Sequence, residues 1–163
     1  MFPAAAALES NSRDAMKAPF ATKSDCVVVY QLHRDKRRVK AVQRATLTTR
    51  KFGIARTHGL FGSDEWWEKI RSGKLAVHTV RGVITRLYMG GMRDTPEFRV
   101  RSDIGEESSW LRYANSKALD EFYAVGRRVE IDYVLQRGRI FSDGSFLKGH
   151  KVVIEVRIGN YVE

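Results

Sequence analysis

The sequence predicts a mainly β protein in which an N-terminal β-hairpin and a short helix precede five more strands, with another short helix between the third and fourth of these. In several segments apolar and polar residues alternate, which is the period of a half-buried strand, and turns rich in Gly or Asp separate these segments. A chain of 163 residues, 43% of them hydrophobic and 29% charged, is long enough for one buried core. The predicted strands cover 26–33, 39–48, 76–89, 96–102, 107–113, 127–136 and 151–158, and the predicted helices cover 64–72 and 117–125.

Residues 1–24 are expected to be a disordered leader. Their apolar run is short, contains Pro3 and lacks the basic segment that precedes it in a secretory signal, and Met16 is an alternative start. No later segment approaches the roughly 18 apolar residues of a membrane span. We therefore expect a cytoplasmic protein.

Residues 25–75 are interpreted as a basic extension. Residues 26–33 are β-branched and aromatic, and the even spacing of Val39, Ala41, Ala45 and Leu47 predicts a second strand, so that 34–38 would form an exposed hairpin tip. The formal net charge of the chain is +10. Residues 25–51 contribute 8 − 2 = +6 of it, whereas the longer segment 76–163 contributes 14 − 12 = +2.

The two adjacent tryptophans lie in the first predicted helix, which Ser63 caps and Gly73 ends. Trp66 shares a helix face with Ile70 and is expected to be buried. Trp67 is rotated by about 100° from Trp66 and is therefore a candidate contact for a partner protein. Burial of both rings in one apolar junction is the alternative.

The strands from residue 76 onward follow a regular pattern. In 76–89 the apolar register changes around Gly82, which predicts a β-bulge there. Ser116 is placed to cap the second helix and Gly126 to end it. Clean alternation in the last two strands predicts a buried face that contains Val129, Ile131, Ile154 and Val156.

This order of elements resembles the OB-fold, a five-stranded Greek-key barrel with a helix between its third and fourth strands. The resemblance is one of topology. It covers 76–158, about half of the chain, and includes the central Gly82 of the long first strand and the Gly-Arg-Arg-Val-Glu-Ile segment at 126–131. It implies an OB-like barrel over 76–163.

The same resemblance implies a binding surface on the second and third barrel strands, where aromatic rings stack on bases and cations follow the backbone. Burial of the aromatic residues in the barrel core is the alternative. The residues that match this surface are Arg99, Arg101, Trp110, Arg112 and Tyr113.

No catalytic or metal-binding pattern is found. The Ser72-Gly73-Lys74 segment lacks the earlier glycine of a phosphate-binding loop, since position 68 is Glu. The four histidines are scattered, and the single cysteine, Cys26, has no zinc-type neighbours. We expect a non-enzyme without cofactor or metal.

Two hypotheses for function follow. In the first, the chain binds single-stranded DNA or RNA through the basic hairpin and the barrel surface. In the second, it is a protein-interaction or assembly module that docks an acidic partner or its own copy through Trp67 and the hairpin, and a small-ligand or sugar site in the barrel is a third, weaker possibility. The hairpin residues assigned to nucleic-acid contact in the first hypothesis are Arg34, Lys36, Arg37, Arg38, Lys40 and Arg44.

Overall fold

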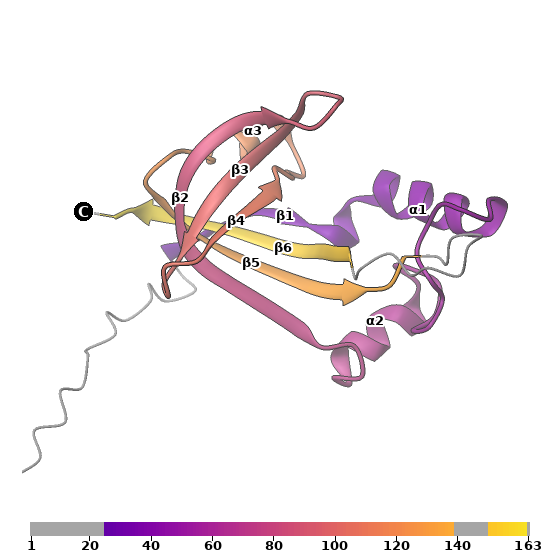
Figure 1. Cartoon of the computed structure of the whole chain (residues 1–163). Helices are drawn as coiled ribbons and strands as arrows, with labels where there is room; N and C mark the ends of the chain where they lie inside the picture. The colour runs from indigo at the N-terminus through magenta and orange to yellow at the C-terminus, as the bar shows by residue number, and fades with distance from the viewer. Residues whose placement is uncertain (1–24, 139–149, 163) are drawn as a thin grey trace, which may run out of the picture.

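The computed structural model describes residues 25–138 and 150–162. Its centre is a single antiparallel sheet of six strands in the order β1-β6-β5-β2-β3-β4 (Figure 1). The prediction of a disordered leader over 1–24 lies outside the described residues. The strands are β1 (Val27–Gln31), β2 (Val77–Gly90), β3 (Thr95–Ser102), β4 (Glu107–Leu111), β5 (Arg127–Gln136) and β6 (His150–Tyr161). The helices are the 3-10 helix η2 (Leu32–Arg34), α1 (Lys36–Thr48), α2 (Asp64–Arg71) and α3 (Lys117–Asp120).

The mainly β class is confirmed, whereas the closed five-stranded barrel is wrong. The sheet is strongly curled (Figure 1), but its terminal strands β1 and β4 do not pair with each other in the described part of the chain. The physical reason is the position of β1, which occupies the outer edge of β6. Because β6 is then paired on both sides, it has no edge left to pair with β4, and the sheet stays open.

The predicted N-terminal hairpin is also wrong, because residues 36–48 form the helix α1. Its inward side carries Val39, Val42 and Thr46, which recur at helical spacing and are half-buried or buried. Two members of the apparent strand alternation, Ala41 and Leu47, are exposed on this helix. The basic cluster therefore lies along a helix that follows β1, and not at a hairpin tip.

Gly82 has a different role from the predicted one. It pairs regularly with both Ser102 and Val129, and the bulge in β2 lies at Thr85. A Cβ atom at position 82 would lie 2.1 Å from the carbonyl oxygen of Arg101. The glycine is thus required because β3 approaches β2 closely at this position.

The predicted core face of the last two strands is largely confirmed. Val129, Ile131 and Val156 are buried, and Ile154 is half-buried. The register passes from Asp132↔Glu155 to Tyr133↔Val153, so Ile154 is the extra residue of a bulge. Because of this extra residue, the strict alternation of buried and exposed side chains in β6 is interrupted at Ile154.

The helices α1 and α2 lie at one end of the sheet (Figure 1). Trp66 of α2 is fully buried, as predicted, and its Nε1 donates a hydrogen bond to Gln136 Oε1 at 3.1 Å. Its ring also packs against Phe61, with ring centres 5.0 Å apart. By strand parity Gln136 lies on the opposite face of β5 from Ile131, so this helical layer covers the outer face of the sheet. Among the described residues, no helix has the length and apolar character that crossing a membrane requires.

Replacing Trp66 by Ala is expected to lower the free energy of unfolding by about 3 to 5 kcal/mol, because a large buried ring is lost and Gln136 keeps no partner for its Oε1. Leu135→Ala is the control: this neighbouring side chain is 45% exposed, and its loss should cost about 0.5 kcal/mol or less. Urea unfolding of both variants measures the difference. Similar losses for the two would contradict the assigned burial.

Candidate partner-binding surface

The helix α1 begins where β1 and η2 end, and Asp35 fixes its first turn. The Asp35 carboxylate accepts a hydrogen bond from the backbone N–H of Arg38 at 3.0 Å, which is an N-cap. The same carboxylate accepts a hydrogen bond from the Tyr30 hydroxyl at 3.2 Å. Asp35 is therefore engaged in holding the helix.

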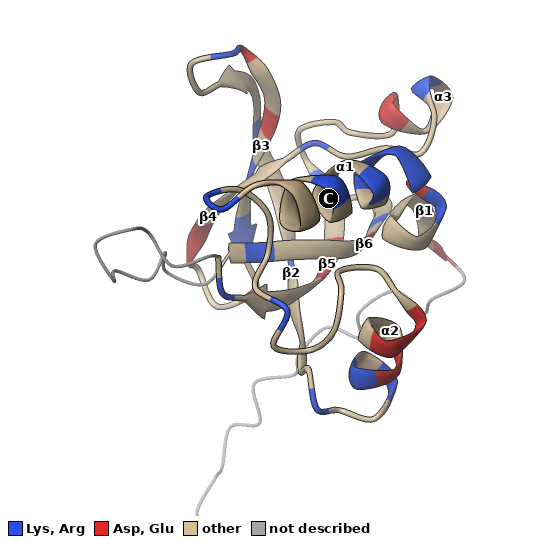
Figure 2. Cartoon of the chain, turned by 90° about the vertical axis from the view of Figure 1, so that its right-hand side faces the viewer, with Lys and Arg blue, Asp and Glu red and all other residues tan. Residues whose placement is uncertain are grey.

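Four cations on α1 form what we term the cationic face: Lys36, Arg37, Lys40 and Arg44. All four are exposed, and three of them recur at spacings of three and four residues, which places them on one side of the helix. Within 26–63, nine residues are Lys or Arg and only Asp35 is acidic, a net charge of 9 − 1 = +8. Figure 2 shows Lys and Arg gathered along α1, whereas α2 carries both signs. None of the four forms an ion pair with the described residues.

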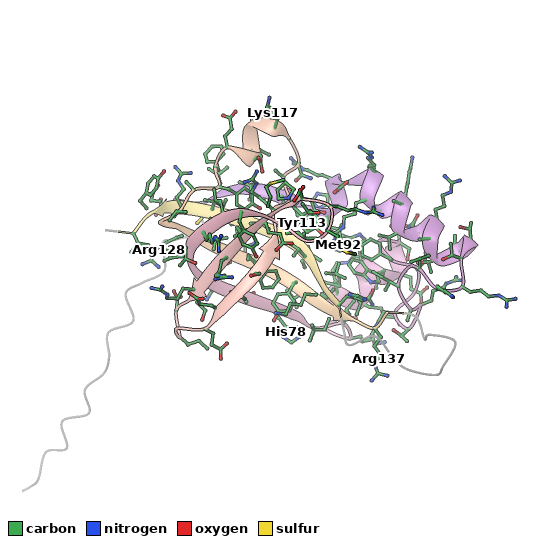
Figure 3. The ribbon with its side chains drawn as sticks, turned by 45° about the horizontal axis from the view of Figure 1, so that its top comes forward. His78, Met92, Tyr113, Lys117, Arg128 and Arg137 are labelled. Atoms are coloured by element: carbon green, nitrogen blue, oxygen red, sulfur yellow. The ribbon has the colours of Figure 1, made fainter. Side chains whose placement is uncertain are left out.

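Arg38 differs from its neighbours because its side chain turns toward the sheet. The guanidinium carbon lies 4.2 Å from the centre of the Tyr113 ring, and one guanidinium nitrogen donates to the Tyr30 hydroxyl at 3.0 Å. The two tyrosine rings stack with centres 5.0 Å apart. Figure 3 shows Tyr113 near the start of α1. Arg38, predicted as an exposed contact, is instead a structural link between α1 and the sheet.

The far end of α1 is held by a second set of contacts. Thr46 is buried, and its Oγ1 accepts a hydrogen bond from Ile54 N at 3.1 Å. Gly53 has a φ of +98°, and a Cβ there would lie 2.3 Å from Thr46 Oγ1. Gln43 Nε2 donates to the carbonyl of Phe61 at 2.9 Å. Contacts near both ends thus hold the inner side of the helix against the rest of the protein and leave the cations on its outer side.

The charges on the outer face of β5 and β6 are paired with one another. Arg157, whose side chain is 6% exposed, lies among Glu130, Asp132 and Glu155, with its Nη2 2.9 Å from Asp132 Oδ2. Burial by itself lowers the pKa of this guanidinium, but the hydrogen bonds to Asp132 and Glu155 outweigh that effect and raise the pKa above its ordinary value. Arg157 on this face is thus neutralised by its acidic neighbours, unlike the cations of α1.

The predicted cations of the β3–β4 region also have acidic partners. Arg99 and Arg101 on β3 lie 4.0 and 3.8 Å from Glu107, in exposed and therefore weak pairs. Arg112 Nε lies 3.0 Å from Asp120 Oδ1, close enough for an ion pair but not in hydrogen-bond geometry. Arg34, by contrast, is exposed on η2.

The predicted aromatic stacking surface does not form. Trp110 is 5% exposed, packs against Tyr133 with ring centres 5.1 Å apart, and donates through Nε1 to Ser108 Oγ at 2.8 Å. Tyr113 is half-buried beneath Arg38. Neither ring presents a free face on which a base could stack.

Trp67 is half-buried. Its ring meets Trp66 edge-on at 4.9 Å and His33 at 6.4 Å, which places it beside η2 and close to the start of α1. Its role as a partner contact stays a prediction. Over 25–138 and 150–162, no group of three or more His, Cys, Asp or Glu side chains is arranged to hold a metal ion.

The curled sheet carries an exposed cationic helix, and the two rings of the predicted stacking surface, Trp110 and Tyr113, are covered by other side chains, an arrangement that suits contact with an acidic protein surface. A family model described as "Immunity protein RhsI2" matches residues 26–159, which is 134 of the 163 residues. The protein therefore belongs to the RhsI2 immunity protein family. No curated protein matches the chain.

Family membership overturns the nucleic-acid hypothesis and supports the protein-interaction alternative. Binding of a single-stranded nucleic acid by this surface requires stacking rings beside the cations. In the structure, however, Trp110 is buried, and the Arg38 guanidinium covers one face of the Tyr113 ring. The residues assigned to nucleic-acid contact keep no such role.

Replacing Arg38 by Met is expected to destabilise the protein by about 1 to 3 kcal/mol, because the cation–π contact and a hydrogen bond to Tyr30 are lost. The matched control is Arg37→Met, one residue earlier on the exposed side, which should change stability by about 0.5 kcal/mol or less. Thermal or urea unfolding compares the two. Equal effects would show that Arg38 does not anchor the helix.

Alkaline pH should weaken the fold through Tyr30. Burial raises the pKa of Tyr30 from 10.0 to about 12, so its stabilising contribution is fully present below pH 10 and is lost as pH rises toward 12. The two-unit shift corresponds to about 3 kcal/mol. Urea unfolding of the wild type and Tyr30→Phe at pH 9 and 11.5 tests this, and the variant should lose less stability over that interval. An identical loss would assign the effect to other groups.

Proposed function

We propose that this chain is an immunity protein that binds a cognate Rhs toxin and neutralises it by occupying part of the toxin surface, without catalysis of its own. Membership of the RhsI2 immunity protein family carries this proposal. The exposed cationic face supports it, because four cations on one helix, none of them paired with an acidic side chain in the described part of the chain, are positioned to meet an acidic protein surface.

The cationic face suits rapid capture of a partner. Its side chains form no ion pairs with the described residues, and the net charge of +8 over 26–63 attracts an oppositely charged surface from a distance. Trp67 lies beside η2, next to this face, and a half-buried tryptophan is the type of residue that anchors protein interfaces. The proposed interface thus combines charge for steering with one aromatic side chain for affinity.

Co-expression tests the proposed function directly. The toxin domain of the Rhs protein that pairs with this chain in its own genome is produced in bacteria with and without the chain. We expect arrested growth with the toxin alone, restored growth when the chain is present, and a complex of the two purified proteins. Unrestored growth together with an absent complex would overturn the proposal.

Reversing charge at Lys40 and Arg44, both to Glu, should lower the association rate constant for that toxin domain about ten- to hundredfold and weaken its salt dependence. The matched control is the double variant Lys74→Glu and Lys117→Glu, which makes the same change in net charge at exposed positions away from α1. Figure 3 shows Lys117 projecting from α3. Stopped-flow or surface-binding kinetics at two salt concentrations compare the variants, and equal rates would remove α1 from the interface.

A further inference from the structure

The two edge strands of the sheet, β1 and β4, differ in whether their outward backbone groups are hydrogen-bonded. At the β1 edge, Asn115 caps three backbone groups: its backbone N–H donates to Val29 O at 2.9 Å, its Oδ1 accepts from Gln31 N at 2.6 Å, and its Nδ2 donates to Gln31 O at 3.1 Å. One residue, through its backbone and its side chain, therefore takes the place of a neighbouring strand along Val29–Gln31. At the β4 edge the described residues contain no corresponding cap.

The hydrogen bonds of β4 show which of its backbone groups are open. Arg112 N donates to Pro96 O at 2.9 Å, and Ser102 N donates to Glu106 O at 2.7 Å, so the even-numbered residues of this segment face β3. In an antiparallel pair the intervening residues direct their N–H and C=O groups to the other side. The open residues of β4 are Glu107, Ser109 and Leu111, and all three have exposed side chains.

This edge has few of the features that usually prevent pairing, and its one charged residue, Glu107, lies at the start of the strand. The β4 sequence, Glu-Ser-Ser-Trp-Leu, contains no Lys, Pro or Gly, and its pairing with β3 has no bulge. The strand is held firmly from its inner side, since Trp110 is buried in the core. Such an edge is a preformed template for one more strand.

The surroundings of the edge favour an acidic segment. Arg99 pairs across the sheet with both Ser109 and Arg86, and Arg101 pairs with Glu107, so three arginines lie on the same face as the open β4 side chains. An added strand would direct alternate side chains to that face. Two carboxylates, Glu97 and Glu107, lie on the same face, so the three cations outnumber them.

The edge also ends near the start of α1. Beyond Leu111 the chain continues through Arg112 to Tyr113, whose ring lies 4.2 Å from the Arg38 guanidinium of α1. The C-terminal end of β4 therefore lies close to the start of α1, the helix that carries the cationic face.

We propose that an extended segment of the toxin, with acidic residues at alternate positions, binds β4 as an added seventh strand. This inference rests on the proposed function, because it names how the same partner is held. The backbone hydrogen bonds of Ser109 and Leu111 supply affinity, and Arg86, Arg99 and Arg101 select the acidic side chains.

The test uses Ser109→Pro in the full chain, with the toxin domain as the probe. Proline removes the outward N–H and is tolerated on an edge strand whose N–H faces solvent, so the fold should persist. We expect binding about tenfold weaker or more, since backbone hydrogen bonds to the added strand are lost. Ser109→Ala keeps the N–H and is the matched control, with unchanged affinity.

Hydrogen exchange of the wild-type chain gives an independent measurement if Ser109→Pro fails to fold. The amides of Ser109 and Leu111 should exchange at least about tenfold more slowly in the complex than in the free chain. Exchange at an unchanged rate, or unchanged affinity of a folded Ser109→Pro variant, overturns the inference while the toxin still binds. Concentration-dependent protection without toxin would assign the edge to a second copy and likewise overturn it. Failure of the wild-type chain to bind the toxin would overturn the proposed function and, with it, this inference.

Discussion

The arrangement of the molecule depends on one cation that is turned inward. The helix α1 carries positive charge along its length and a single acidic residue, Asp35, at its start, so the repulsion among its cations must be offset by contacts on its inner side. Arg38 makes the central contact by lying over Tyr113 and donating to Tyr30. Because Tyr30 belongs to β1 and Tyr113 follows β4, this one side chain connects the helix to both terminal strands of the sheet.

The later strands could be predicted from sequence because each has its own period and turn. Even there, the alternation wrongly predicted full burial of Ile154. The bulge at this residue depends on how β5 and β6 pair, which the sequence of one strand does not reveal. The segment 36–48 was mispredicted because Ala and β-branched residues fit both periods. The helix is favoured by the N-cap from Asp35 and by the burial of Thr46 against Gly53. Both contacts involve residues that lie outside the alternating segment 39–48.

The candidate site was predicted in part. The sequence located the excess of positive charge correctly, but exposed cations serve an acidic protein and a nucleic acid equally well. The discriminating feature is the burial of Trp110, which results from packing against Tyr133 on a strand distant in sequence. The open edge was missed for a related reason. Its existence depends on β1 pairing with β6, a contact between the two ends of the described chain that no local pattern contains.

The cap that Asn115 places on β1 has a consequence for the size of any assembly. Sheets that grow by edge-to-edge addition need two available edges on every subunit, one to receive and one to extend. A subunit with a single available edge can end a growing sheet but cannot continue it. The cap at Val29 and Gln31 therefore disfavours fibres that grow through the sheet of this protein, and a complex made through β4 would leave no second matching edge for further addition.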